Sequence, residues 1–420
     1  MWMFACTGPP SDPPAPSPDW ADVAPLVERS CAGCHFDGAV AGLPLTRWEE
    51  VHAARGAVQY AVEQRVMPPW PAGPSDFPFA NEARLTDDEV ALLVRWIDAG
   101  APLGDGPDEL LVGPPVGALP QVDVTLNNPA AYHPDASRVD DYRCFELRPS
   151  GPTEAYLRGF EVLVDNPLVV HHVKLLAVYP LDGGATLDAQ AALDPLPGFA
   201  CNDTDEPAYG GPGLLIGGWL PGSGATVFPD GSGVPLAPGA RFVLVVHYHP
   251  PGFEAGLDQT EVALWTAPAV DRYVDPVRLT DLDWRLPPDA GGMSIAAGDP
   301  SDVYTYTTRV ADLPVGSFDL TEGVELTSAQ FHMHLLGTSG RIDVTVGGEP
   351  HVLLDLPRWD FDWQLDYVLQ DPIRLGPDDT ITLTCTYDNS SGATDVGWGE
   401  GTADEMCSAI VNVLPPASAE

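Results

Sequence analysis

Six of the ten histidines in this chain stand in three tight pairs, a spacing that is typical of metal ligands. The pairs are His171 with His172, His247 with His249, and His332 with His334. Side chains along a strand alternate between its two faces, so each H-x-H pair places both rings on one face. Adjacent histidines can meet only where a strand bends or has just begun. Histidines packed in a core or facing water are the simpler interpretation of any single pair, but three pairs together favour a metal site.

Cys31, Cys34 and His35 form a second motif, C-x-x-C-H, in the stretch LVERSCAGCHFDG. Two thiols at this spacing can add to the vinyl groups of haem while the histidine binds the iron. A redox dithiol is the alternative, but it favours a βαβ context and does not need the histidine. Met67, in RVMPPWPAG, is the expected sixth iron ligand because a loop after a helix can fold over the open haem face. His52 is the alternative ligand, and a methionine that only fills a core is the structural alternative.

The elements that must position these residues differ between the two parts of the chain. Helical periodicity is confined to the first hundred residues, over 20–28, 48–64 and 85–100. The last of these helices begins with a Thr cap and acidic residues and ends at Gly100. A Gly/Pro-rich stretch over 104–120 predicts a flexible linker. Beyond it, short β-branched runs and turn signals predict antiparallel strands in sandwiches.

Composition limits the partners and the compartment. Acidic residues outnumber basic ones by 61 to 19, and the net charge of −42 excludes nucleic acid as a partner because phosphate would be repelled. No apolar run approaches the length of a membrane span. The start, MWMFACTGPPSDPPAPSPDW, is similar to the end of a bacterial lipoprotein signal followed by a proline-rich tether. Cys6 is then either a lipid-attachment site or a leftover surface cysteine. A lipid on Cys6 would be the only membrane contact expected.

The order of the motifs resembles that of a known family. HH is followed by HYH, after GGWLPGSG and PLAPGARFVLVV, then by HMHLLG and DEMCSAIV. Over about residues 120–415, this order resembles the copper type II ascorbate-dependent monooxygenases, the family of peptidylglycine α-hydroxylating and dopamine β-monooxygenases. Residues 20–102 resemble a small cytochrome c. Together they imply a multidomain chain, with a small all-α cytochrome c domain followed by two all-β antiparallel, jelly-roll-like sandwiches. The expected division is tether 1–18, haem domain 19–103, linker 104–120, first sandwich 121–275 and second sandwich 276–416.

The resemblance also implies which residues bind two copper ions, one that stores an electron (CuH) and one that binds oxygen (CuM). The matching donors are, for CuH, His171, His172 and His247 and, for CuM, His332, His334 and Met406. Imidazole suits both Cu(I) and Cu(II), whereas a thioether favours Cu(I), the state that must meet dioxygen. His249 has no counterpart in the family and is expected to lie outside the ligand set of CuH.

Four of the seven cysteines remain once Cys6 and the haem motif are set aside. The resemblance implies a disulfide between Cys385 and Cys407, next to Met406, and Cys144 would then pair with Cys201. Disulfides indicate an oxidising compartment, so the expected location is periplasmic or extracellular.

Two positions depart from the peptide-hydroxylating members of the family. Gln330 stands where they have an arginine for the peptide carboxylate, and Ile410 stands where they have a tyrosine. These departures disfavour a substrate with a C-terminal glycine carboxylate. A phenethylamine has only the acidic surface in its favour.

The sequence predicts a monooxygenase that hydroxylates an aliphatic C–H bond of a small molecule or peptide with O2. Electrons would enter through haem c, from ascorbate or from another donor such as a periplasmic protein. A non-enzymatic haem and copper electron carrier, or a copper-binding protein, on the same scaffold is the alternative. An adhesion module with structural histidines is a further one, but it leaves Met406 and the haem motif unexplained.

Overall fold

The structure, a computed structural model, describes residues 17–36, 42–112, 118–138, 140–149, 156–178, 183–201, 213–219, 223–250, 256–361, 363–399, 401 and 403–417. The chain forms two compact units, Met1–Pro68 with Arg84–Pro114 and Pro69–Ala83 with Pro115–Glu420. We call them the helical unit and the β unit. Cys6 and most of the proline-rich start lie outside the described residues.

The helical unit is built from α1 (Trp20–Ser30), α2 (Trp48–Glu63) and α3 (Asp87–Asp98). The expected Thr cap of α3 is present, because Thr86 accepts a hydrogen bond from the Glu89 N–H and the Glu89 carboxylate accepts one from the Thr86 N–H. Gly100 follows the helix with φ +93°, a conformation that glycine adopts at low cost. In the core, the rings of Trp20 and Trp96 pack 5.6 Å apart.

The two stretches that join the units depart from the expected division of the chain. Within the expected linker, Leu111 is buried in the core of the helical unit and its N–H donates to the Thr46 carbonyl. Residues 69–83, expected inside the haem domain, belong to the β unit instead, and we call them the strap. N–H groups of the strap donate to carbonyls of β17 (Glu349–Leu356) and β18 (Asp366–Leu375). Trp70 and Phe79 pack against Tyr367 with ring centroids 5.1 and 5.5 Å away.

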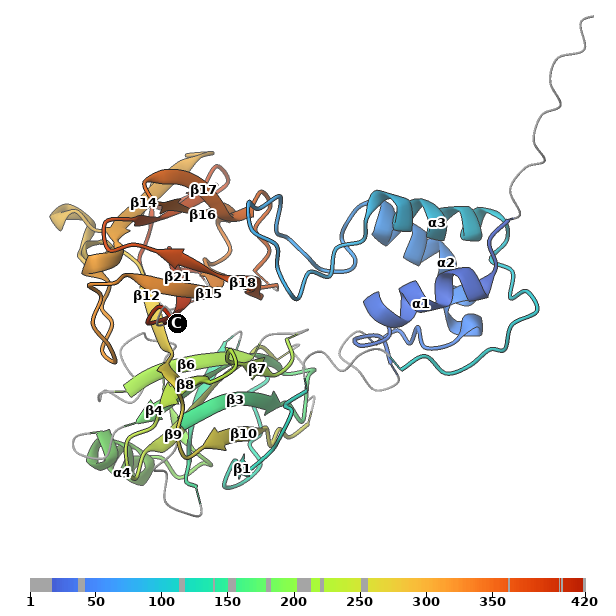
Figure 1. Ribbon diagram of the computed structural model, residues 1–420. Helices are drawn as coiled ribbons and strands as arrows, with labels where there is room; N and C mark the ends of the chain where they lie inside the picture. The colour runs from blue at the N-terminus through green and yellow to red at the C-terminus, as the bar shows by residue number, and fades with distance from the viewer. Residues whose placement is uncertain are drawn as a thin grey trace, which may run out of the picture. The chain divides into compact units, whose positions relative to one another are not determined.

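The first sandwich of the β unit is formed by two sheets (Figure 1). One has the order β1 (Val124–Asn127), β10 (Glu261–Ala267), β3 (Tyr156–Leu163), β8 (Ser232–Pro235) and β11 (Arg272–Tyr273), with β7 (Thr226–Val227) paired to β3. The other has the order β5 (Phe199–Ala200), β2 (Asp141–Leu147), β9 (Arg241–Tyr248), β4 (Val170–Val178) and β6 (Gly213–Trp219). Aromatic and branched side chains such as Phe145, Phe160 and Phe242 fill the space between the sheets.

Helix α4 (Gly183–Leu193) corrects the expectation that helices stop near residue 100. Its sequence, GGATLDAQAAL, is rich in alanine, which has the highest helix propensity. Leu187 is fully buried in a small cluster with Cys144 and Phe199. A strong local preference combined with one apolar anchor is enough to form this helix beside a sheet.

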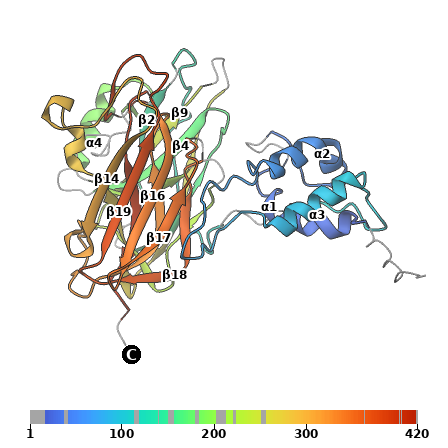
Figure 2. The same cartoon turned by 90° about the horizontal axis from the view of Figure 1, so that it is seen from above.

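The second sandwich also has two main sheets. One has the order β12 (Asp275–Leu279), β21 (Ser408–Leu414), β15 (Val324–His332) and β18; the other has β14 (Asp302–Arg309), β19 (Thr380–Tyr387), β16 (Gly337–Val346) and β17, seen side by side in Figure 2. A short ladder joins β13 (Ser294–Ile295) to β20 (Val396–Gly397), and 3-10 turns occur at η1 (Leu282–Arg285), η2 (Pro288–Ala290) and η3 (Val310–Asp312). Strict alternation of buried and half-buried residues along β19 is the pattern expected of a sandwich strand.

Both expected disulfides are confirmed: Cys385 pairs with Cys407, and Cys144 with Cys201. Cys385 lies on β19 and Cys407 directly precedes β21, so this bond links the two main sheets of the second sandwich. Among the described residues, no helix is both long enough and apolar enough to cross a membrane.

Candidate metal centres

His171, His172 and His247 meet where β4 pairs with β9, and we call them the three-histidine cluster. Val170 lies opposite Tyr248 and His172 opposite His247, so His171 is an extra residue in the ladder. Such a β-bulge turns successive side chains away from strict alternation. The two adjacent histidines can therefore both face His247, as the sequence predicted for a bulge or strand end.

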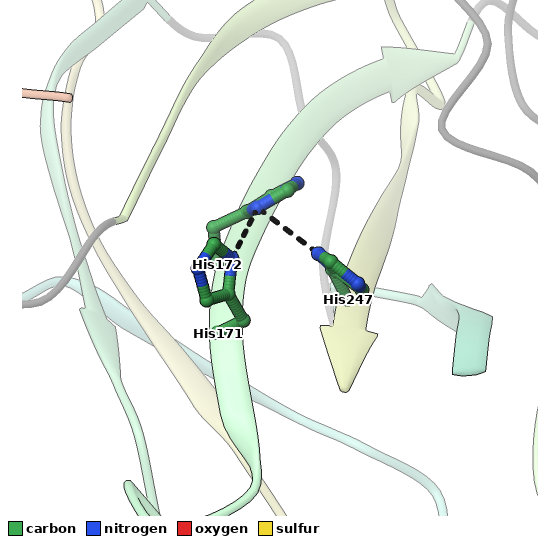
Figure 3. A group of neighbouring side chains, drawn as sticks. All are labelled: His171, His172 and His247. Carbon is green, nitrogen blue, oxygen red and sulfur yellow. Dashed lines mark hydrogen bonds between the residues drawn. The ribbon is translucent and has the colours of Figure 1, made fainter. Parts of the chain in front are cut away.

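The Nδ1 atoms of the three rings converge (Figure 3). Nδ1 of His172 lies 3.2 Å from Nδ1 of His171 and 3.4 Å from Nδ1 of His247. His172 is 6% exposed and His247 is 1% exposed. Three imidazole nitrogens aimed at one point in a mostly buried place are a donor set that fits a copper ion.

An acidic residue sets the orientation of His247. Its Nε2 donates to Asp140 Oδ1 at 2.9 Å, and since a carboxylate only accepts, the proton resides on Nε2 and the Nδ1 lone pair faces the cluster. The ring of Tyr142 stacks on His247 with centroids 4.2 Å apart. His249 is exposed, and its Nδ1 lies 3.7 Å from the same Asp140 oxygen. It therefore neighbours the carboxylate that orients the cluster.

Asp140→Ala should weaken copper binding at the three-histidine cluster about tenfold, because His247 loses the partner that fixes its tautomer. Asp140→Asn keeps an acceptor oxygen and should lose less. Copper titration against a competing chelator measures both affinities, and Asp230→Ala, which removes a fully exposed carboxylate, is the control. Unchanged copper affinity in Asp140→Ala would contradict this role.

His332, His334 and Met406, which we call the His-Met cluster, come from the ends of two paired strands. β15 ends at His332, which lies opposite Ser408, the first residue of β21. His334 lies two residues after His332, and Met406 lies two residues before Ser408. Met406 is 1% exposed, so its thioether is held inside the protein.

Hydrogen bonds decide which nitrogens of this cluster carry lone pairs. Nδ1 of His332 donates to Gln364 Oε1 at 2.6 Å, and the Gln364 amide nitrogen donates to the Phe361 carbonyl at 2.9 Å. Nδ1 of His334 donates to the Asp404 carbonyl at 3.0 Å. Both rings therefore keep their lone pair on Nε2. The ring centroids are 5.0 Å apart, and two imidazoles with a thioether fit a site that favours Cu(I).

Glu405 joins the two halves of the His-Met cluster. One carboxylate oxygen accepts hydrogen bonds from the N–H groups of His334, at 2.9 Å, and Met406, at 3.2 Å. The other accepts from the Leu336 N–H at 2.6 Å. Burial raises the pKa of Glu405 to about 7, and the bonds from backbone N–H groups oppose that rise. One buried carboxylate thus holds the strand ends that carry both kinds of donor.

Glu405→Gln should weaken copper binding at the His-Met cluster about tenfold and lower the free energy of unfolding by about 1–3 kcal/mol. The amide retains one acceptor oxygen and directs an NH2 group at backbone N–H donors. Copper titration and urea unfolding measure the two effects. The control is Glu322→Gln, since Glu322 is exposed in a turn of the same sandwich. A variant as stable as the control, with full copper affinity, would argue against this role.

One pocket in the β unit touches both clusters. It is lined by His172 and His332, and the space between its walls, with the open solvent in it included, is about 620 Å³. Gln330 and Ile410, the two positions that depart from the peptide-hydroxylating pattern, line it as well. Phe361 also connects the clusters, because its ring stacks on His171 at 5.0 Å and lies 6.1 Å from the ring of His334. The two clusters therefore face a shared space.

The C-x-x-C-H motif lies at the end of α1. Nδ1 of His35 donates to the Leu43 carbonyl at 2.8 Å, which leaves Nε2 as the nitrogen that can bind iron. Burial raises the pKa of Cys31 to about 12 and also raises that of Cys34, which is unlike the low pKa of a redox dithiol. Phe36 and Leu43, beside the motif, are 49% and 40% exposed. An apolar surface next to two thiols and an oriented histidine fits a covalent haem.

The expected sixth iron ligand and its alternative both lie in the helical unit. Met67 follows α2 and is half-buried, while His52 lies on α2 with its ring 4.7 Å from that of Trp48. The choice between Met67 and His52 stays a prediction.

The fold and the site together describe a protein of two β-sandwiches in which two groups of potential metal donors line one pocket. Residues 312–418 match the family model described as copper type II ascorbate-dependent monooxygenase, C-terminal domain. Over these residues, the second sandwich is similar to that domain.

Curated relatives show the same likeness at low identity. The chain is 24% identical over 235 residues to tyramine beta-hydroxylase of Caenorhabditis briggsae, covering 52% of this chain and 37% of that protein. It is 25% identical over 218 residues to dopamine beta-hydroxylase of Bos taurus, covering 49% of this chain and 33% of that protein. The alignments thus span about a third of the length of these relatives. Among solved structures, the major capsid protein P2 of bacteriophage PM2 aligns with a TM-score of 0.28 and 9% identity, over 70% of this chain and 98% of that one.

Sequence reasoning missed the residues that orient the donors. Asp140, Gln364 and Phe361 lie far along the chain from the rings that they contact. Only Glu405 carried a signal, because an acidic residue directly before a buried methionine needs partners for its charge.

Proposed function

We propose that this chain is a copper-dependent monooxygenase that hydroxylates an aliphatic C–H bond of a small molecule or peptide. The observation that carries the proposal is the pocket lined by His172 from one donor cluster and His332 from the other. The balanced reaction is R–H + O2 + two electrons + two protons giving R–OH + H2O. The names of the curated relatives, two beta-hydroxylases, support the same type of reaction.

The two clusters divide the work because their donors differ. Copper ions bound there would each supply one electron to dioxygen. The three-histidine cluster presents only imidazole nitrogens, which suit an ion that alternates between two oxidation states. The His-Met cluster adds the Met406 thioether, which stabilises the reduced ion that meets oxygen. Phe361, whose ring stacks on His171, and Ile410, which lines the pocket, would present apolar surface to the hydrocarbon part of a substrate.

Electrons would enter through a haem c on Cys31, Cys34 and His35, from ascorbate, or from both. The exposed apolar surface beside the motif supports a haem in the helical unit. The two disulfides support a periplasmic or extracellular location, where a donor protein would meet the helical unit. A lipid anchor on Cys6 belongs to the same proposal.

Protein produced in a periplasm with haem maturation should contain one haem and two copper ions per chain and consume oxygen when reduced. Elemental analysis, the haem absorbance band and an oxygen electrode measure these quantities, while mass gains of one oxygen in pooled metabolites would reveal the product. Zinc in preference to copper in fully loaded, active protein would overturn the copper assignment. Copper and haem without any oxygen consumption would point to an electron carrier.

A further inference from the structure

A second group of metal donors lies directly outside the three-histidine cluster. It consists of Asp140, His247 and His249, whose ligand atoms all lie within 4.8 Å of one another, and we call it the outer group. The side chain of His249 is 52% exposed and that of Asp140 is 23% exposed, whereas that of His247 is 1% exposed. The outer group therefore extends from the protein surface to the buried cluster, with which it shares His247.

His247 connects the two groups through the two nitrogens of its ring. Its Nδ1 lies 3.4 Å from Nδ1 of His172, inside the cluster. Its Nε2 lies 2.9 Å from Asp140 Oδ1, on the outer side, and Nδ1 of His249 lies 3.7 Å from the same oxygen. A metal ion held by the outer group would be separated from the cluster by a single imidazole ring.

The backbone holds His249 beside the cluster. His249 directly follows β9, and its N–H donates to the carbonyl of Val169, the residue before β4, at 2.8 Å. The ring centroid of His249 lies 6.1 Å from that of His171 and 6.4 Å from that of His247. The two strands that position the cluster therefore position His249 as well.

The three-histidine cluster needs a path by which a metal ion can enter, because two of its rings are almost fully buried. Two imidazole nitrogens and a carboxylate oxygen form a donor set that suits Cu(II). The net charge of −42 also draws cations to the protein surface, where His249 is exposed. The outer group thus has both the donors and the exposure of an entry site.

We propose that the outer group captures a Cu(II) ion and passes it to the three-histidine cluster. The inference rests on the proposed function, because it takes that cluster as a copper site. Capture at Nε2 of His247 displaces the proton of that nitrogen to water, and transfer of the ion to Nδ1 returns a proton from water to Nε2. Asp140 then accepts the hydrogen bond from His247 again. His249 acts during loading, whereas Asp140 also orients the filled cluster.

His249→Gln should slow the loading of the three-histidine cluster about tenfold, because glutamine can form hydrogen bonds but is a poor metal ligand. Release of copper to a chelator should slow by the same factor, since entry and release follow one path. The copper affinity at equilibrium should therefore stay unchanged. Metal-free full chain, mixed with the Cu(II)–glycine complex and frozen at successive times, gives the loading rate from the EPR signal of the cluster.

The matched control is His351→Gln. His351 lies on β17 in the second sandwich, its side chain is 37% exposed, and its Nδ1 lies 3.8 Å from Asp76 Oδ2. It is thus another exposed histidine beside a carboxylate. Loading of the three-histidine cluster should be normal in this variant, and loading of the His-Met cluster should be normal in both variants.

Two results would overturn the entry site. Loading of His249→Gln at the rate of the control would show that copper enters by another path, such as the shared pocket. A loss of copper affinity in proportion to the slower loading would make His249 a ligand or a support of the filled cluster.

Copper content and oxygen consumption of the unaltered chain separate this inference from the proposed function. A three-histidine cluster that held no copper at equilibrium would overturn both. Loading that depends on His249 as expected, in protein that holds two copper ions but consumes no oxygen, would support the entry site and overturn the monooxygenase.

Discussion

Met406→Ile is expected to lower hydroxylation about 100-fold while leaving copper bound at the three-histidine cluster. Isoleucine retains most of the volume of methionine, so the free energy of unfolding should change by less than about 1.5 kcal/mol. The thioether, however, is the only soft donor of the His-Met cluster, and without it Cu(I) loses the ligand that it favours. Turnover with reductant, copper stoichiometry and X-ray absorption at the sulfur distance measure the three consequences.

The control for this prediction is Met293→Ile, because Met293 is another fully buried methionine in the second sandwich. Both variants should lose similar stability, but only Met406→Ile should lose activity and the copper–sulfur signal. Normal turnover in Met406→Ile would show that Met406 only fills the core. The family alignment at the C-terminus would then fail as well.

The histidines of both clusters stood out in the sequence because they occur in closely spaced pairs, whereas Met406 was proposed only from the resemblance. The HH pair indicated a bulge, and the register between β4 and β9 contains one at His171. The H-x-H pair was expected on one face of a strand, but only His332 lies on β15, as its last residue, and His334 lies two residues beyond the strand. Sequence periodicity predicted a strand for each histidine and the face toward which it would point. The proposal that these residues bind two copper ions came from the order of the motifs, which resembles that of the family.

The partners of those donors were not predictable, because they depend on tertiary contacts between distant segments. Asp140 precedes a strand, and nothing in its local sequence points to His247, more than a hundred residues away.

The packing of the strap was not predictable from its local sequence either. Its sequence, PWPAGPSDFPFANEA, has the proline and glycine content of a loop, yet Trp70 and Phe79 bury their rings against the second sandwich. Burial of two aromatic rings outweighs the lack of local periodicity.

The strap changes how the helical unit is connected to the rest of the protein. A single linker was expected at 104–120, but the chain passes between the units at 68–69, 83–84 and 114–115. Met67 stands three residues before Trp70, whose ring is buried in the β unit. The loop that carries the proposed iron ligand is therefore continuous in sequence with a segment that packs in the β unit.

Met67→Ala should slow turnover driven by a reduced donor cytochrome about 100-fold, while turnover driven by ascorbate stays unchanged. A methionine ligand raises the reduction potential of haem, and at 59 mV per tenfold a fall of about 120 mV lowers the equilibrium constant for electron transfer from the donor about 100-fold, so less haem is reduced in each turnover. Stopped-flow absorbance at the haem band, after mixing with the reduced donor, measures the transfer rate.

His52→Ala is the matched variant, since His52 is the alternative ligand. A change in the haem spectrum of His52→Ala, with a normal haem spectrum in Met67→Ala, would make His52 the sixth ligand. Equal slowing with ascorbate and with the donor protein would place the defect of Met67→Ala outside electron entry. If pre-reduced haem failed to pass electrons to oxidised copper within one turnover time, the helical unit would have no part in supplying the reaction.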